Sequence, residues 1–226
     1  MAGVTHSPFR QLVASFGRPG LFFSEMLSAK SLVKENLEES IFLKRSPLER
    51  PMAYQIFAAD PAGALTGCQR LLQTDAEIID FNLCCPAPEI AKRRKAGAHL
   101  LTDLDLTAQV LSALRKAMDR PLTVKIRLGR KPDRAFLRDL AALFESCGVA
   151  AVTLHPRLTT EKLKRRARWE YIGFLKSVPR LPVIGNGDVT GPADCFKMFD
   201  QTGCDGVMVG RGILDFAKLG RRSGFG

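Results

Sequence analysis

The chain has 226 residues, 46% of them hydrophobic, and its 34 Lys and Arg outnumber 23 Asp and Glu to give a formal net charge of +11. This length and hydrophobic content suit one large core, and the positive charge favours a polyanionic partner over the alternative, a basic surface kept for solubility. The six cysteines form no Cys-x-x-Cys pair, and no apolar run reaches the length of a membrane span or follows a charged amino-terminal region. Zinc sites, disulfide frameworks, signal peptides and membrane helices are therefore not indicated, and we expect a soluble protein in a reducing, cytoplasmic setting.

Short apolar runs that favour β-strands recur along the chain, about 24 to 44 residues apart. They are Leu21–Met26, Met52–Ala58, Ile78–Leu83, Leu122–Leu128, Ala151–Pro156, Pro182–Asp188 and Gly206–Gly210. That spacing fits a strand, a crossover helix and two loops, and the continuous hydrophobicity suits strands buried on both faces. Residues Asp105–Met118 and Arg134–Glu145, which lie between such runs, carry apolar stripes with helical spacing. The pattern predicts parallel β/α repetition.

The opening residues Met1–Val4 are interpreted as the end of one more strand, which brings the expected number to eight. Eight parallel strands close into a (β/α)8 TIM barrel. A doubly wound open sheet is the alternative, but its first strand is normally followed by a glycine-rich phosphate turn, which MAGVTHSP does not resemble. The sequence thus predicts one barrel domain over residues 1–213 and a basic tail over residues 214–226.

Barrel active sites lie at the carboxyl ends of the strands. Polar side chains stand there on nearly every expected strand, and we expect them to converge on one pocket. They are Glu25, Gln55, Asn82, Cys85, Lys125, Arg127, His155, Arg157, Asn186, Asp188 and Arg211.

Six stretches in order resemble one known family, and the likeness spans Met1 to Gly212. They are MAGVTHSPFR, SEML, FNLCCP, VKIRLG, LHPR and LPVIGNGDVTGPADCFKMFDQTGCDGVMVGRG. Together they resemble the tRNA-dihydrouridine synthases, flavin enzymes that reduce uridine in tRNA. The resemblance implies tRNA as partner and an FMN cofactor, reduced by NADPH or NADH, that passes hydride to C6 of uracil while an acid protonates C5. We expect a monomer that needs no metal and no membrane.

Within this resemblance, Cys85 matches the family's proton donor. A thiol suits that task because its unperturbed pKa of about 8.5 leaves it mostly protonated at neutral pH. Cys84 and Pro156 stand where the family usually has glycine, and we expect Cys84 to be an inert thiol that adds bulk to the loop. The residues expected to contact FMN are Met1, Ala2, Gly3, Gln55, Lys125, His155, Asn186, Gly187, Asp188, Gly210 and Arg211.

Three residues, Asn82, Arg127 and Arg157, are expected to contact the uridine or the surrounding RNA. The basic run Lys92, Arg93, Arg94 and Lys95 follows the cysteine loop directly and is expected to hold the RNA backbone beside the pocket. A second basic run, Thr159–Tyr171, follows the strand that ends at His155 and is expected to face RNA as well.

Two other functions stay open. One is an FMN barrel that reduces a free pyrimidine or an enone, which would need no surface for a phosphate backbone. The other is a catalytically impaired RNA-binding fragment, because family members usually begin before the residues that match Met1 and continue into a helical carboxyl-terminal domain. From the resemblance we therefore expect a chain truncated at both ends.

Overall fold

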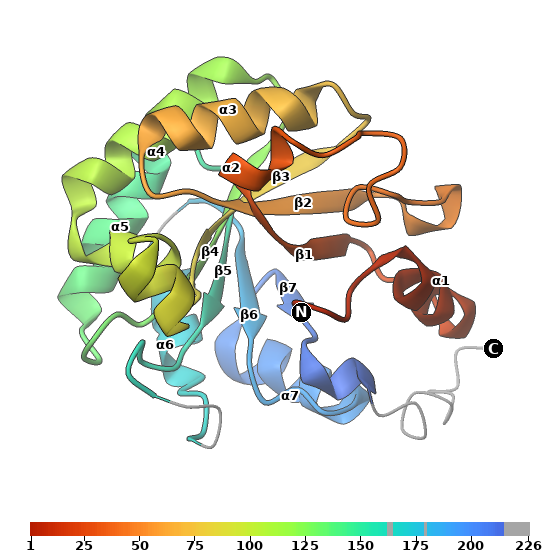
Figure 1. The fold of residues 1–226 in the computed structure, drawn as a ribbon. Coiled ribbons are helices and arrows are strands. Elements are labelled where there is room, and N and C mark those ends of the chain that lie inside the picture. The colour runs from red at the N-terminus through yellow and green to blue at the C-terminus, as the bar shows by residue number, and fades with distance from the viewer. Residues whose placement is uncertain (162–164, 179, 215–226) are drawn as a thin grey trace.

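The computed structural model describes residues 1–161, 165–178 and 180–214 (Figure 1). Its centre is a seven-stranded parallel sheet in which the strands lie side by side in chain order and curl into a half-barrel. The strands are β1 (Phe22–Ser28), β2 (Met52–Phe57), β3 (Ile78–Leu83), β4 (Leu122–Arg127), β5 (Ala151–His155), β6 (Val183–Asn186) and β7 (Gly206–Met208). Each predicted run from Leu21 onward overlaps one of these strands, although β1 extends two residues beyond the predicted Met26, so the predicted parallel β/α repetition is confirmed.

Helices connect the strands and cover the outer face of the curled sheet (Figure 1). The α-helices are α1 (Ser7–Phe16), α2 (Ala29–Leu32), α3 (Pro61–Leu72), α4 (Leu104–Ala117), α5 (Arg134–Ser146), α6 (Glu170–Lys176) and α7 (Pro192–Thr202). Shorter turns are η1 (Pro47–Glu49), η3 (Gly97–Thr102), η4 (Arg211–Leu214) and the π-helical turn η2 (Glu89–Arg93). The helices expected over Asp105–Met118 and Arg134–Glu145 are confirmed as α4 and α5, each begun by an aspartate whose side chain accepts backbone N–H groups of the first turn.

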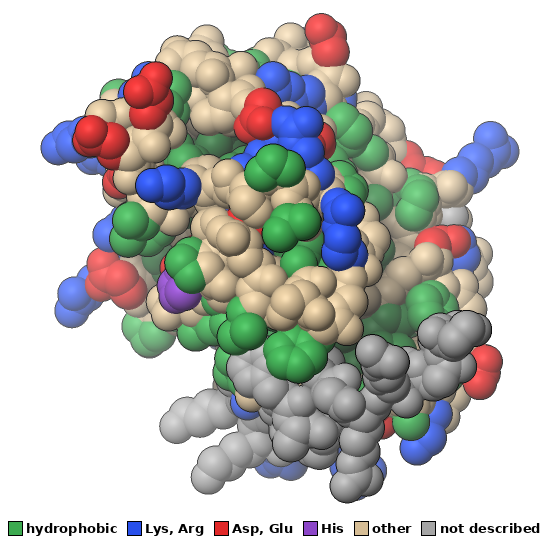
Figure 2. All heavy atoms as spheres, turned by 90° about the vertical axis from the view of Figure 1, so that its right-hand side faces the viewer, with side chains coloured by type: hydrophobic (Ala, Val, Ile, Leu, Met, Phe, Trp, Pro, Cys, Tyr) green, Lys and Arg blue, Asp and Glu red, His purple; other side chains and the backbone are tan. Residues whose placement is uncertain are grey.

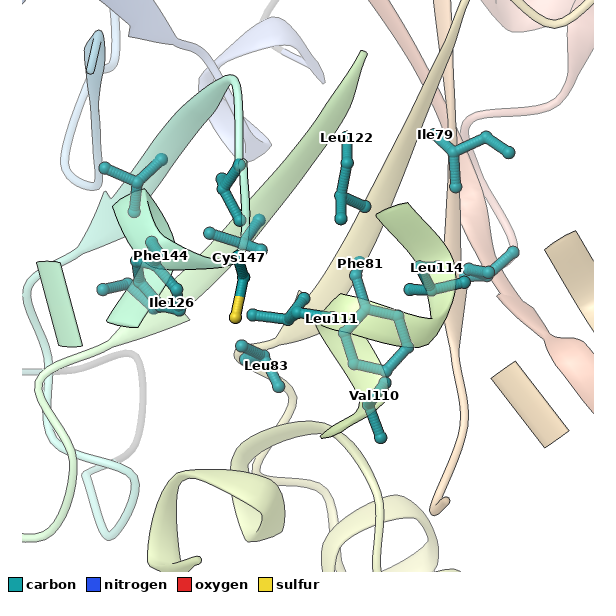
Figure 3. Close-up of a cluster of buried hydrophobic side chains, with 14 of the residues drawn as sticks. Ile79, Phe81, Leu83, Val110, Leu111, Leu114, Leu122, Ile126, Phe144 and Cys147 are labelled. Atoms are coloured by element: carbon teal, nitrogen blue, oxygen red, sulfur yellow. The ribbon is translucent and has the colours of Figure 1, made fainter. Parts of the chain in front are cut away.

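The main core lies between the sheet and its helices. Alternate residues of β3, namely Ile79, Phe81 and Leu83, face outward and pack against the apolar stripe of α4 that includes Val110 and Leu111 (Figure 3). All five side chains are fully buried. Because strand side chains alternate between the two faces, the same packing turns the residues in between toward the inside of the half-barrel.

The expected strand at Met1–Val4 is wrong, because these residues form a turn that contributes nothing to the sheet. Both Val4 N–H and Thr5 N–H donate to Met1 O at 3.1 Å, and Gly3 N–H donates to the Glu25 carboxylate of β1 at 2.8 Å. With these backbone groups bonded locally or to a side chain, no ladder forms, and β1 and β7 are the outer strands of the described sheet.

The end of the sheet at which β2 begins lies toward the right in Figure 1. There Arg45 and Arg50 form ion pairs with Asp75 and Glu77, among them Arg45 Nη2 to Asp75 Oδ2 at 2.5 Å. Figure 2 shows the molecule from this side, with basic and acidic side chains lying next to one another. Cations at this end thus have acidic neighbours to balance them.

No helix within the described residues is long and apolar enough to cross a membrane. Residues 215–226, nearly all of the expected basic tail, lie outside the described residues, as do residues 162–164 of the second basic run.

Candidate active site

The inward-facing residues of β2 to β6 are mostly polar, and they form the floor of a site at the carboxyl ends of the strands. Those residues include Gln55, Asp80, Asn82, Thr123, Lys125, Arg127, Thr153, His155 and Asn186. Most of these polar residues are buried. The residues between them face outward and are mostly apolar. Buried polar groups need hydrogen-bond partners, and here they find them in one another.

A chain of hydrogen bonds runs from inside the half-barrel to the cysteine loop. Asp80 is fully buried and accepts from Thr123 Oγ1 and from Gln55 Nε2, both at 2.6 Å. Gln55 Oε1 then accepts from Asn82 Nδ2 at 2.9 Å. Asn82 Oδ1 accepts the backbone N–H groups of Cys84 and Cys85, at 3.0 and 2.9 Å.

This chain fixes the orientation of two side-chain amides. The carboxyl oxygens of Asp80 accept, so Gln55 presents its NH2 group to Asp80 and its carbonyl to Asn82. Asn82 is therefore left with its own carbonyl facing the cysteine loop, where it holds two successive N–H groups. Asp80 and Thr123 were not among the residues expected in the site. The alternation of polar residues within IIDFNL was the sequence signal that could have identified Asp80.

Cys85 lies at the rim of the site, in the loop after β3 and next to Cys84, and is half-buried. It packs against a small apolar cluster formed by Phe57, Ile90 and Ala96. Burial raises the pKa of the Cys85 thiol, and this outweighs the opposite effect of the Ala87 backbone N–H and of the nearby cations. The thiol is therefore protonated at neutral pH, which is the form that a proton donor needs.

Cys84 is buried, and its sulfur lies 3.5 Å from Lys125 Nζ. Lys125 also donates to Asn186 Oδ1 at 3.1 Å, and Asn186 Nδ2 donates to Met208 O at 2.7 Å. The cation of Lys125 thus connects the end of β3 with the ends of β6 and β7 across the inside of the half-barrel. Of the two adjacent cysteines, the one expected to be inert is the one that contacts Lys125.

His155, at the end of β5, is held by a buried arginine. Arg157 is only 2% exposed, and it contacts His155 Nε2 at 2.7 Å, Arg165 O at 2.5 Å and the Asp188 carboxylate. A guanidinium only donates, so His155 Nε2 accepts and the ring proton is on Nδ1. Burial, aided by Lys125, Arg127 and further cations, lowers the pKa of His155 to about 2, so the ring is neutral.

A pH-dependent loss of stability is expected from His155. Below pH 6.5, its usual pKa, the unfolded chain binds a proton that the folded chain does not, so the free energy of unfolding falls as pH falls. One such group accounts for at most about 1.4 kcal/mol per pH unit. Denaturant unfolding between pH 7 and pH 5 should show a smaller decrease for His155→Gln than for the unchanged chain. His99→Gln, at an exposed histidine, is the control, and an equal pH dependence in all three proteins would contradict this assignment.

Gly187 directly follows β6 and has a backbone φ of 112°, a conformation that favours glycine. A Cβ atom there would be 2.8 Å from His155 Cδ2, so the close approach of the loop to the imidazole also requires glycine. Gly187 O accepts from Trp169 Nε1 at 2.9 Å, and the Asp188 carboxylate accepts from Ala167 N–H at 2.6 Å. The loop after β6 is thereby fixed to the segment before α6.

Further expected residues lie around this centre. Arg211 opens η4, is exposed and contributes to the lowered pKa of His155, while Gly210 precedes it. The turn of Met1, Ala2 and Gly3 lies against β1 through the bond from Gly3 to Glu25. Burial lowers the pKa of the Met1 ammonium, and this outweighs the opposite effect of the Glu25 carboxylate.

Arg127 is buried and turned toward the second basic run. Its Nη1 donates to Leu158 O at 2.9 Å and to Glu161 O at 3.2 Å, while its Nε atom has no hydrogen-bond partner among the described residues. In the same run, Arg168 forms a two-armed ion pair with Glu161, at 2.6 and 2.7 Å. Part of this basic run is therefore bonded to the protein itself.

The four cations Lys92, Arg93, Arg94 and Lys95 are all exposed, on and after η2. Glu89 lies 3.1 Å from Arg93 and 3.6 Å from Arg94, and the Arg94 guanidinium also stands 5.8 Å from the centre of the Phe57 ring. One carboxylate against four cations leaves this segment strongly positive, next to the loop that carries Cys85.

The structure therefore gathers most of the polar residues expected at the strand ends into two connected groups. One extends from Gln55 and Asn82 through the cysteine loop to Lys125 and Asn186, and the other joins His155, Arg157, Gly187 and Asp188. No cluster of three or more metal-binding side chains occurs in the part of the chain that the structure describes.

Comparison with known proteins identifies the family to which this chain belongs. A family model described as "Dihydrouridine synthase (Dus)" matches residues 1–219. The "tRNA-dihydrouridine synthase B" of Proteus vulgaris is 37% identical over 211 residues, which are 93% of this chain and 65% of that protein. Proteins of the same name from Pseudomonas aeruginosa and Escherichia coli (strain K12) are each 35% identical over 93% of this chain, which covers 63% and 65% of them. The chain spans slightly less than two thirds of the length of these relatives.

Among solved structures, that of nitroalkane oxidase from Streptomyces ansochromogenes matches 95% of this chain and 64% of its own, with a TM-score of 0.54 and 14% identity. At that identity the likeness concerns the fold alone. The family model, in contrast, covers nearly the whole chain, including every residue of the site described above. This chain belongs to the dihydrouridine synthase family.

Proposed function

We propose that this chain is the barrel part of an FMN-dependent enzyme that reduces uridine in tRNA to 5,6-dihydrouridine, with NADPH or NADH as reductant. The observation that carries the proposal is the placement of a protonated thiol, Cys85, on a loop anchored by Asn82 at the carboxyl ends of the strands that hold Lys125 and His155. Membership of the family and relatives named tRNA-dihydrouridine synthase B support it.

The groups at the mouth fit a flavin phosphate. Lys125, Arg127, Arg157 and Arg211 outnumber the acids Glu25 and Asp188, and Arg127 Nε is buried with no partner among the described atoms. Because Gly187 has no side chain, the loop after β6 packs directly against His155. We propose that Lys125 and His155 Nδ1–H face the ring and that Gly187, Gly210 and Arg211 face the phosphate, where strand-end loops of barrels often bind phosphate. The turn of Met1, Ala2 and Gly3, with Gln55, Asn186 and Asp188, completes the proposed set.

Bound FMN would supply the hydride for C6 of the uracil. Cys85 delivers the proton to C5, and its raised pKa keeps that proton available at neutral pH. Lys125 provides a positive charge close to where negative charge develops during reduction. Asn82 keeps the cysteine loop in position. Arg127 holds the segment after β5 through Leu158 O, and Arg157 holds the His155 ring.

A uridine inside folded tRNA must leave its stack before it can reach this site, at a cost of a few kcal/mol. We propose that Lys92, Arg93, Arg94 and Lys95 offset that cost by binding backbone phosphates next to the Cys85 loop. Arg157 is already bonded on three sides within the protein, so we assign it the positioning of His155 in preference to a direct contact with RNA.

The proposal has further parts. The barrel domain extends over residues 1–213, and an eighth strand can close the sheet between β7 and β1, whose outer edges do not pair with each other within the described residues. The protein acts as a monomer in the cytoplasm, which is compatible with six free cysteines.

The proposed reaction can be tested with the purified chain, FMN, NADPH and a tRNA transcript that carries no modification. We expect a yellow protein that bleaches on addition of NADPH, and dihydrouridine in the tRNA by mass spectrometry. If the protein bleaches and leaves tRNA unchanged but reduces a free pyrimidine or an enone, the substrate assignment is wrong. A colourless protein that only binds tRNA would overturn the assignment as an oxidoreductase.

A further inference from the structure

A cavity lies beside the candidate active site, between η3 and the loop that joins β4 to α5. Its volume is about 280 Å³. Its walls are largely apolar and include Ala98, Leu101, Leu128 and Phe136, and Arg130 and Lys131 stand at its edge. Arg130 and Lys131 are exposed, whereas the first three wall residues are buried, so the cavity combines apolar walls with a cationic rim.

The cavity adjoins the candidate active site on two sides. Ala98 N–H donates to Cys85 O at 3.0 Å, so one wall begins where the cysteine loop ends. On the other side, Leu128 directly follows Arg127 and its N–H donates to Arg157 O at 3.2 Å. The cavity is therefore within reach of an RNA strand whose reacting base enters the candidate active site.

The lining of the cavity suits an aromatic ring. The Phe136 ring lies against Gly129, where a Cβ atom would be 3.1 Å from Phe136 Cε1, and Gly129 has φ of 81°. Asp133 is the acid in the lining, and its Oδ1 already accepts two N–H groups at the start of α5 while its Oδ2 lies 3.1 Å from Lys131 Nζ. The remaining charge at the rim is positive, which favours a ligand that carries phosphate next to its ring.

We propose that this cavity binds an unpaired nucleobase of the RNA, a neighbour of the uridine that is reduced, with its phosphate against Arg130 and Lys131. This inference rests on the proposed function, since it takes the ligand to be the same RNA strand. Aromatic and apolar surfaces beside cations are the means by which proteins hold splayed bases. The cavity would thus fix the position of the strand while the reacting uridine occupies the barrel.

The test uses the whole chain with Thr102→Trp, which fills the cavity from an exposed wall position. The matched control is Thr66→Trp on α3, because Thr66 is also exposed and its hydroxyl, like that of Thr102, donates to a carbonyl earlier in its own helix. The probes are an unmodified tRNA transcript and a series of its variants, each lacking one base near a target uridine. Equilibrium binding and dihydrouridine formation are measured for every pair.

We expect Thr102→Trp to weaken transcript binding by roughly 5- to 150-fold, the equivalent of one stacked base, while Thr66→Trp binds like the unchanged protein. One of the RNA variants that lack a base should bind the unchanged protein more weakly by a similar factor. The same RNA variant should bind Thr102→Trp no more weakly than the complete transcript does. Independent losses that multiply, or unchanged binding by Thr102→Trp, would overturn the proposal, as would a chain that binds no RNA. If binding shows this coupling but no dihydrouridine forms, the cavity assignment stands and the proposed reaction fails.

Discussion

Replacing Cys85 by alanine is expected to lower uridine reduction by about 100- to 10,000-fold, the usual contribution of a positioned general acid. Flavin binding and its reduction by NADPH should persist, because the sulfur of Cys85 packs against Phe57, Ile90 and Ala96 and is not bonded to Lys125 or His155. The measurement is the rate of dihydrouridine formation in tRNA, together with the flavin absorbance before and after addition of NADPH.

The adjacent cysteine supplies the matched control. Cys84→Ala also removes one sulfur atom from the same loop, and we expect this variant to keep most of the activity. The structure sharpens this comparison, because Cys84 contacts Lys125 at 3.5 Å while Cys85 does not. If Cys84→Ala abolishes reduction and Cys85→Ala retains it, the proton donor has been assigned to the wrong sulfur. If both variants stay active, neither thiol is the acid.

Replacing Arg157 by methionine is expected to lower the free energy of unfolding by about 3 to 5 kcal/mol, the range for breaking a buried charged contact. The guanidinium is almost fully buried and joins β5 to the loop after β6. Its removal leaves the Asp188 carboxylate with Ala167 N–H, and leaves His155 Nε2 without its donor in a buried place. Denaturant unfolding at pH 7 measures the loss.

Arg168→Met is the control for Arg157, since the Arg168 side chain is 30% exposed against 2% for Arg157 and its loss should cost about 1 kcal/mol or less. Arg157→Lys should not restore stability, because an ammonium cannot reproduce the planar fork that serves three acceptors. Equal small losses for Arg157→Met and Arg168→Met would show that the buried arginine is not a structural link. The methionine variant should also lose activity, since His155 would no longer be held with its proton on Nδ1.

The comparison of β3 with the opening residues shows which features local patterns can predict. IIDFNL is apolar at every outward position, and its predicted role as a buried strand is confirmed, while the catalytic site at its end stays a prediction. Met1–Val4 has a similar apolar character but no neighbouring strand bonds to it, and it folds into a turn held by Glu25. A strand exists only where a partner strand satisfies its backbone, which a single segment cannot reveal.

By itself, the sequence determined the seven parallel strands, the helices α4 and α5, and the position of Cys85 at a strand end, because these follow from side-chain period and from the order of polar residues. Only the tertiary structure decided which polar groups meet. Asp80 reaches the cysteine loop through Gln55, Cys84 takes the place beside Lys125, and Arg157 turns inward to His155 and Asp188. Those contacts depend on the curvature of the sheet and on the register between strands, and neither can be predicted from the residue pattern of a single strand.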